Sequence, residues 1–271
     1  MDLGQLILLA IVQGITEFLP ISSSGHLVLA PKLFGAEDQG VLIDVALHLG
    51  SLGAVLLYFW RDVQGAIIGP FTLVGDLSAR RALSWESKLA LLLIVATIPV
   101  VLVGLGLAGI GAFEQIRTIE VIGWTTLLYG LALYVADRFS PQMLELKDWT
   151  FGGAIILGLA QALALIPGTS RSGVCMTAAR FLGFSRVEAA RVALLMAVPA
   201  ILAASAKGAY DLYKSGDAAL TLNAGIAAAF AFISAYAALA VMMRMLRSVS
   251  FTPFVIYRIL LGSLLLWIAY G

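Results

Sequence analysis

The chain carries the segment LAIVQGITEFLPISSSGHLVLAPKLFG at residues 9–35 and a second version of it, LGLAQALALIPGTSRSGVCMTAARFLG, at residues 157–183. The two align without a gap at an offset of 148 positions (157 − 9). The matching positions are Gln13/Gln161, Ser22/Ser170, Ser24/Ser172, Gly25/Gly173, Ala30/Ala178 and Gly35/Gly183, with Lys32 opposite Arg180. This self-similarity indicates an internal duplication. Each copy is an apolar segment broken by a Ser/Gly/Pro cluster, so we expect the functional site where the copies meet.

The composition is that of a membrane protein. Hydrophobic residues make up 61% of the chain and charged residues 12%, against about 25% charged residues in an ordinary soluble domain. A net charge of +1 leaves no basic surplus for nucleic acid, so nucleic-acid binding is not expected. Cys175 is the single cysteine, which excludes an intrachain disulfide, and no Cys/His spacing resembles a zinc site.

Six apolar runs are long enough to cross a bilayer, which requires about 20 residues. They cover roughly residues 41–60, 88–109, 117–137, 187–208, 218–243 and 252–270. The duplicated stretches are too short for two spans and too disrupted for one, so we interpret each as a re-entrant helical hairpin. Irregular backbone at membrane depth is tolerated where it lines a wet cavity, so these breaks should line an internal site.

The number of spans predicts the topology. One hairpin plus three transmembrane helices per half is an odd number of crossings, so the second half is inverted relative to the first. We therefore expect an all-α polytopic membrane protein with an inverted-topology repeat. The whole chain, 1–271, forms one membrane domain, with repeat 1 at 1–137 and repeat 2 at 149–271.

The distribution of basic residues predicts the orientation. Eleven fall on one side of the predicted topology, namely Arg61, Arg80, Arg81, Lys88, Arg138, Lys147, Arg180, Arg186, Arg191, Arg244 and Arg247. Four fall on the other, namely Lys32, Arg117, Lys207 and Lys214. The positive-inside rule places the larger group in the cytoplasm. The connection at about 61–87 is then a cytoplasmic loop, with or without an interfacial helix, and both termini and the first hairpin face outward.

The first break holds the polar residues Gln13, Glu17, Ser22, Ser23, Ser24 and His26. Gln13 and Glu17 are four apart and share one helical face. An ionisable residue at membrane depth is costly and is a candidate for function. Alternatively, Glu17 reaches interfacial water. Capping of the next helix explains one serine, but not three together with a histidine.

The second break holds Gly168, Thr169, Ser170, Arg171, Ser172 and Gly173. Free backbone amides at the start of a helix attract anions, and the planar guanidinium of arginine suits phosphate. Alternatively, Arg171 only pairs with Glu17 to neutralise two buried charges. The break is no P-loop, because GxxxxGK[ST] is absent.

Two further polar features lie outside the breaks. Asp44 and His48 are four apart in the first full span. They form a second polar layer or metal ligands near the site, or else they cap and hydrogen-bond within helix packing. Arg258 in the last span either meets an acidic headgroup or snorkels to the interface.

The two break motifs resemble those of a known family. Gln13-x-x-x-Glu17 followed by FLPISSSGH, together with PGTSRSG, is similar to undecaprenyl pyrophosphate phosphatases of the bacitracin-resistance type. The resemblance extends to DVALHLGSLGAVLLYFW at 44–60 and SFTPFVIYR at 250–258. The family usually has Thr where this chain has Cys175, so a role for that hydroxyl does not carry over.

The resemblance implies an activity. Members of the family remove the terminal phosphate of a C55 polyprenyl diphosphate lipid in the bacterial inner membrane, at an extracytoplasmic active site that requires a divalent cation, here Mg²⁺ or Ca²⁺. We expect Glu17, Ser23, His26 and Arg171 to be catalytic. Substrate binding is expected from Gln13, Ser22, Ser24, Gly168, Thr169, Ser170, Ser172 and Gly173. Glu17 is the first candidate metal ligand and Asp44 the weaker one.

Several alternatives stay open at this stage. Ser23 is the favoured nucleophile and Ser22 the second, activated by His26 or Glu17; direct attack by a metal-activated water is the other route. A transporter or flippase of a polyprenyl phosphate lipid is the rival function, because inverted repeats with broken helices are typical of transporters. A channel or purely structural role leaves the Ser/His/Glu/Arg set unexplained. A homodimer is compatible with the sequence, which does not determine the oligomeric state.

Overall fold

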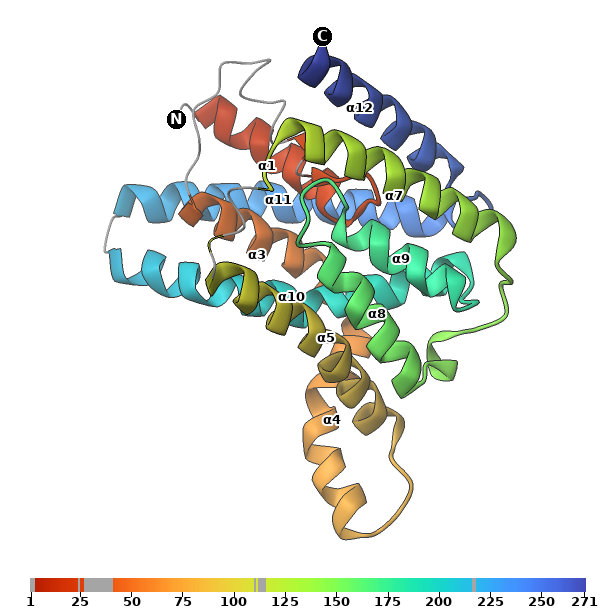
Figure 1. Ribbon diagram of the computed structural model, residues 1–271. Coiled ribbons are helices and arrows are strands. Elements are labelled where there is room, and N and C mark those ends of the chain that lie inside the picture. Colours follow the sequence, from red (N-terminus) through yellow and green to blue (C-terminus); the bar gives the residue numbers. More distant parts are fainter. Residues whose placement is uncertain (1–2, 24, 27–40, 110, 112–115, 216–217) are drawn as a thin grey trace.

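The computed structural model describes residues 3–23, 25–26, 41–109, 111, 116–215 and 218–271 (Figure 1). Within these ranges the chain forms helices and no strand. The helices are α1 Leu3–Phe18, α3 Val41–Tyr58, α4 Trp60–Ser78, α5 Trp85–Gly109, α7 Ile119–Phe139, the 3₁₀ helix η1 Leu146–Asp148, α8 Phe151–Leu163, α9 Arg171–Phe181, α10 Arg186–Ser215, α11 Ala218–Met245 and α12 Thr252–Tyr270.

Five of these helices are long and apolar enough to cross a membrane. They are α5, α7, α10, α11 and α12, and each overlaps one of the predicted spans. Their 18-residue windows have mean hydropathies from 1.5 to 2.7 with few charges, as expected for segments in contact with lipid. The chain is therefore an all-α polytopic membrane protein.

The first predicted full span is part of a bent pair of helices. α3 turns by 94° into α4, and together they provide a sixth candidate span. The expected cytoplasmic loop at 61–87 is therefore mostly helical, and only its end is a loop. α4 and α5 form a hairpin in which α4 and the first part of α5 extend away from the other helices, while the rest of α5 packs against α8 and α10 (Figure 1). The helix that the sequence allowed in this connection is α4, which occupies most of it and tolerates Pro70 in its interior.

The helices of the duplicated stretches are shorter. α1 has 16 residues, α8 has 13 and α9 has 11, fewer than the roughly 20 that a span requires. α8 and α9 pack against each other across the second break, as a re-entrant hairpin requires. The returning arm of the first hairpin falls largely outside the described residues. The division into an inverted repeat stays a prediction.

Close helix contacts place the two breaks in the middle of the bundle. α11 packs against α1 and α3, α12 against α7, α5 against α8, and α10 against α3 and α9. Gly158 makes the α5–α8 approach possible, since an added Cβ would lie 2.7 Å from the Ala96 carbonyl oxygen and 2.9 Å from Pro99. Small residues are the usual means of such close packing in membranes.

An ion cluster joins four helices at the carboxyl end of α7. The Asp137 carboxylate accepts from Arg180 Nε at 3.2 Å, from Arg186 Nε at 2.7 Å and from the Phe251 backbone N–H at 3.0 Å. Arg180 is fully buried and also donates to the carbonyls of Asp137, Ser140, Pro141 and Phe184. Because every member is hydrogen-bonded, the cluster can remain charged inside the protein.

Candidate active site

The two breaks share an uncommon backbone conformation. Ser22 has φ 74° and Ser170 has φ 67°, and these serines align in the duplication (22 + 148 = 170). Non-glycine residues rarely adopt positive φ, and those that do are concentrated at functional sites. The Ser170 hydroxyl accepts the Gly173 N–H at 3.2 Å and so caps α9. Each break is thus a specific turn rather than an irregular loop.

Helix α7 holds the second break in place. The Thr125 hydroxyl donates to the Pro167 carbonyl at 2.6 Å and the Thr126 hydroxyl to the Gly168 carbonyl at 3.2 Å. Gly168 has φ 88°, and a side chain there would collide with the Thr125 hydroxyl and the Ile122 carbonyl. A glycine is therefore required at this position.

The two breaks touch each other directly. The Ser172 hydroxyl donates to the Leu19 carbonyl at 3.0 Å, across 153 positions of sequence. It also lies 3.2 Å from the Ser170 hydroxyl. The predicted convergence of the two copies is therefore observed, and Ser172 is one of the residues that joins them.

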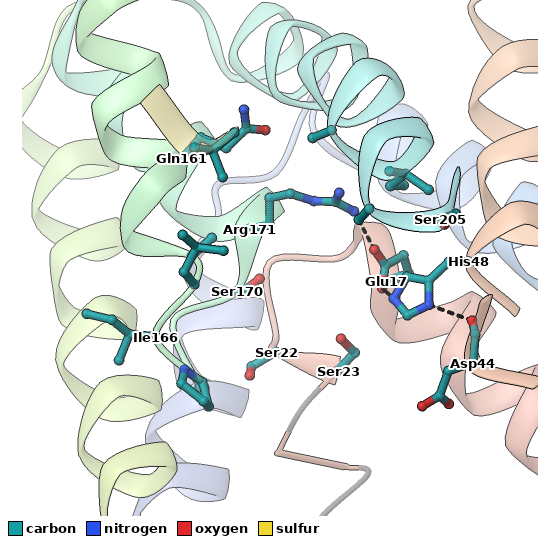
Figure 2. Close-up of a pocket in the computed structure, with 18 of the residues that line it drawn as sticks. Glu17, Ser22, Ser23, Asp44, His48, Gln161, Ile166, Ser170, Arg171 and Ser205 are labelled. Carbon is teal, nitrogen blue, oxygen red and sulfur yellow. Dashed lines mark hydrogen bonds and ion pairs between the residues drawn. The ribbon is translucent and has the colours of Figure 1, made fainter. Parts of the chain in front are cut away.

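A cavity of about 480 Å³ opens beside this junction, within the usual range for small-molecule sites. Its polar lining includes Glu17, Ser22, Ser23, Asp44, His48, Arg117, Gln161, Ser170, Arg171 and Ser205. Its apolar lining comes mainly from α10 and from the segment 164–167 that follows α8, with one residue each from α3 and α5. Figure 2 shows Arg171 reaching across the cavity to Glu17, with Ser22 and Ser23 facing the same space.

Glu17 is the centre of the polar cluster. Its Oε1 forms an ion pair with Arg171 Nη2, and its Oε2 accepts from Gln13 Nε2 at 2.7 Å. Glu17 is only 9% exposed, so its charge depends on these partners. The structure thus contains the predicted ion pair between Arg171 and Glu17, and both residues line the cavity.

His48 is the third side chain on this carboxylate. Its Nε2 lies 3.7 Å from Glu17 Oε2 and 3.4 Å from Gln13 Nε2. Its Nδ1 lies 2.7 Å from the Asp44 carbonyl oxygen, so in the neutral ring Nδ1–H donates there and Nε2 is the acceptor. Of the two readings of Asp44 and His48, the polar layer beside the site is the one that this arrangement supports.

His26 lies on the other side of the first break. Its Nδ1 is 2.8 Å from the Ser22 carbonyl, and its Nε2 is 2.5 Å from the Tyr257 hydroxyl. The two rings stack with centroids 5.6 Å apart. In the neutral ring, Nδ1–H donates to Ser22 and Nε2 accepts from Tyr257. His26 is not among the residues that line the cavity.

The predicted site residues therefore divide into groups. Glu17, Ser22, Ser23, Asp44, Gly168, Ser170 and Arg171 line the cavity. Gln13, Thr169, Ser172, Gly173 and His26 lie behind the lining, as partners of the turns and of Glu17. Ser24 lies outside the described residues. The catalytic and binding roles assigned to all of them stay predictions.

Two residues at or near the site were not predicted from the sequence. Arg117, in the segment before α7, lines the cavity and is exposed; its only sequence signal is that it is one of few basic residues on its side of the predicted topology. Tyr257 belongs to the segment SFTPFVIYR at 250–258, and nothing in its spacing from His26, 231 positions away, could indicate their hydrogen bond.

In the part of the chain that the structure describes, the side chains that could contact a divalent cation leave room for further ligands from a substrate or water. Among the described residues, no three His, Cys, Asp or Glu side chains are grouped closely enough to bind a metal ion. Gln13 Oε1, however, is buried without a hydrogen-bond partner, next to the Glu17 carboxylate. Mg²⁺ typically takes one or two carboxylates plus substrate phosphates and water, and this donor set fits that pattern.

Known proteins similar to the chain agree on one family. The family described as bacitracin resistance protein BacA matches residues 6–264. A protein of Jannaschia sp. named undecaprenyl-diphosphatase is 55% identical, with all of both chains covered. Proteins with that name from Ruegeria pomeroyi and Alteromonas mediterranea are 55% and 44% identical, again over the full length of both chains. The cavity between two broken helices, with its Glu17–Arg171 pair, therefore belongs to a member of the bacitracin resistance protein BacA family.

Proposed function

We propose that this chain is an undecaprenyl-diphosphatase. It hydrolyses the anhydride bond of undecaprenyl diphosphate, giving undecaprenyl monophosphate and inorganic phosphate, and so recycles the lipid carrier of cell-wall synthesis. The full-length identity to proteins of that name supports the assignment. The observation that carries it is that Arg171, Glu17, Ser22 and Ser23 line one cavity, with Arg171 paired to Glu17.

Arg171 and the start of α9 bind the terminal phosphate. A guanidinium can hold two phosphate oxygens at once, and the first backbone N–H groups of a helix add donors. The incoming phosphate competes with Glu17 for Arg171, so substrate binding releases the Glu17 carboxylate from its ion pair. Positioning and charge neutralisation of this kind dominate catalysis of phosphoryl transfer.

Ser23 is the proposed nucleophile. Its hydroxyl attacks the terminal phosphorus and loses its proton to a base, and the bond to the bridging oxygen breaks, so undecaprenyl monophosphate leaves. Water then hydrolyses the phosphoserine and releases inorganic phosphate. Glu17 is the better-placed base because it lines the same cavity, whereas the acceptor nitrogen of His26 is bound to Tyr257. Direct attack by water, with the serines only binding, is the alternative route.

A divalent cation, Mg²⁺ or Ca²⁺, would be held by Glu17 and the Gln13 amide oxygen together with the diphosphate, with Asp44 as a further candidate. When bound, it neutralises phosphate charge and polarises the phosphoryl group. The residues of the chain supply the geometry around it: Gln13 orients the carboxylate through its 2.7 Å hydrogen bond to Oε2, and His48 lies 3.7 Å from the same oxygen.

The proposed location is the bacterial inner membrane, with the cavity open to the extracytoplasmic side. The eleven-to-four distribution of basic residues supports this orientation. The isoprenoid tail lies between apolar helices, and the cavity walls from α5 and α10 supply such surface. A homodimer stays a prediction.

The direct test is phosphate release from undecaprenyl diphosphate by purified protein in detergent, with and without a chelator. Wild type should release phosphate, and chelation should stop it. Arg171→Lys should remain folded and lose at least about tenfold in kcat/KM, because an ammonium cannot make the bidentate contact. Transport of the lipid across vesicles without phosphate release would instead identify a flippase.

The serine variants separate the two chemical routes. Loss of a nucleophile should abolish turnover in Ser23→Ala while lipid binding persists, and Ser22→Ala should keep measurable kcat. A Ser23→Ala enzyme with near-normal kcat and raised KM would remove Ser23 as nucleophile and leave attack by water, with Glu17 as base.

A further inference from the structure

Arg258 in α12 is buried in the centre of the protein. Its side chain is 0% exposed, so it neither snorkels to the interface nor meets a headgroup, and both expectations from the sequence were wrong. Apolar surroundings alone would not accommodate a guanidinium, which needs a partner for each donor when it leaves water. The question is therefore what Arg258 binds.

Among the described residues its guanidinium binds only backbone carbonyls, and they come from three separate segments. Nη1 donates to Pro20 of the first break at 3.4 Å. Nη2 lies 3.1 Å from both the Gly168 and the Thr169 carbonyls of the second break. The remaining contacts, at 3.0 Å from Nε and 3.4 Å from Nη2, are to Thr126 and Thr125 of α7. One side chain thus connects both breaks to the helix that supports them.

No carboxylate among the described residues neutralises Arg258. Arg180 provides the contrast: it is equally buried and also binds several carbonyls, but it has Asp137 as counter-ion. A buried pair with a carboxylate would balance the charge of Arg258. Without one, its positive charge contributes to the potential at the two breaks.

The carbonyls held by Arg258 determine where the neighbouring amides point. In a trans peptide the C=O and the following N–H point in opposite directions. The Thr169 carbonyl faces Arg258, so the Ser170 N–H is directed away from it, and Ser170 lines the cavity. Ser170 is also the residue with φ 67° that precedes Arg171. Arg258 therefore stabilises the unfavourable conformation of the turn.

Two glycines make room for this side chain. A Cβ on Gly130 of α7 would lie 2.9 Å from Arg258 Cβ and 3.4 Å from its Nε. A Cβ on Gly173 of α9 would lie 3.1 Å from its Nη1. These distances are shorter than ordinary van der Waals contacts. The backbone of α7 on one side and of α9 on the other therefore limits where the Arg258 side chain can lie.

We propose that Arg258 is a positioning residue for the phosphatase reaction. It holds the two broken helices in the one arrangement in which Ser23, Glu17 and Arg171 share a cavity, and it places an unneutralised positive charge behind the phosphate site. It does not contact substrate. The inference rests on the proposed function and adds a residue on which the geometry of the site depends.

The first experiment compares Arg258→Lys with Arg180→Lys. Both remove one fully buried, carbonyl-bound guanidinium and keep the charge, but only Arg258 touches the breaks. Lysine has three donors, so it cannot hold five carbonyls. We expect similar losses of Tm in detergent for the two variants. For equal amounts of folded protein, kcat should fall at least about tenfold in Arg258→Lys, with KM much less affected, and stay within about twofold of wild type in Arg180→Lys.

A second pair covers the case in which Arg258→Lys does not fold. Gly130→Ala displaces Arg258 without removing it, whereas Gly123→Ala crowds the same two helices, α7 and α12, through Leu266, with Cβ–Cδ2 at 2.8 Å. Gly130→Ala should lower kcat severalfold more than Gly123→Ala does. Equal kcat within each pair of variants would overturn the proposal, since Arg258 would then only support the fold.

The same assays separate this proposal from the proposed function. If wild type releases no phosphate from undecaprenyl diphosphate, the activity itself is wrong. If wild type is active and the two variants of each pair have equal kcat, the proposed activity is supported and only the proposed role of Arg258 is wrong.

Discussion

Ser22 and Ser170 show how single residues shape the site. Both adopt positive φ at aligned positions of the duplication, and both line the cavity. Left-handed backbone is unfavourable for residues with a Cβ, and a glycine at either position would remove the strain. A serine at these positions keeps the strained turn but adds a hydroxyl that glycine lacks. The hydroxyl of Ser170 caps α9.

The strain at Ser170 can be measured with a pair of substitutions. Ser170→Gly and Ser170→Ala both lose the capping hydroxyl, but only glycine relieves the backbone. We expect the glycine variant to be more stable by about 1 kcal/mol, measured as the difference in thermal or denaturant unfolding in detergent. The control is Ser172, inside α9, where alanine should be the more stable of the two. The same order at both positions would show that Ser170 is not strained.

Arg117 adds a cationic group to the cavity without an ion-pair partner among the described residues. We expect Arg117→Ala to raise KM a few-fold and to leave kcat almost unchanged, because an exposed charge attracts the anionic headgroup without orienting it. The effect should shrink as salt is raised. Arg247→Ala, an exposed arginine outside this cavity, serves as control for net charge; an equal effect there would contradict a role of Arg117 in the site.

At the scale of elements, the α4–α5 hairpin depends on one buried carboxylate. Asp76 accepts from the Ser84 backbone N–H at 2.8 Å, from the Ser84 and Ser87 hydroxyls at 2.8 and 2.7 Å, and from Arg81 at 2.7 Å. The Ser84 amide, followed by the hydroxyls, holds the pKa of Asp76 far below its usual range. The turn is therefore organised around the ionised side chain.

Asp76→Asn should open this turn at neutral pH. Because the pKa is lower in the folded state, the stabilisation by Asp76 is fully present above the unfolded pKa of about 3.9 and is lost as pH falls below it. We expect faster proteolysis of the 79–84 turn in the variant at pH 7. The two proteins should become alike toward and below the depressed folded pKa, where Asp76 is also protonated. A difference that is independent of pH would show that the charge of Asp76 is not the cause.

At the scale of the whole molecule, the arrangement of the two halves determines the orientation of the cavity. If the repeats are inverted, the α4–α5 turn and the C-terminus lie on opposite sides of the membrane. Tags in the turn at 79–84 and after Gly271 should then be labelled from opposite sides in intact cells. Labelling of both from one side would contradict the inverted repeat, and labelling of the turn from outside would reverse the proposed orientation.

The sequence by itself determined the membrane class, five of the spans and the two breaks, because hydropathy, glycine content and register are properties of neighbouring residues. It also predicted that Arg171 and Glu17 lie together. It left the extent of α4 open, because this helix contains glycines and Pro70 and packs on α5.

Only the tertiary structure decided which polar groups line the cavity and which hold its walls. His26 and Tyr257 are joined over 231 positions, Ser172 and Leu19 over 153, and Arg258 and Pro20 over 238. Ser22 and Ser172 look alike in the sequence, yet one lines the cavity and the other connects the two breaks. A buried side-chain donor points toward the carbonyl that accepts from it. Distant helices supply these carbonyls, and the local sequence does not encode where those helices lie.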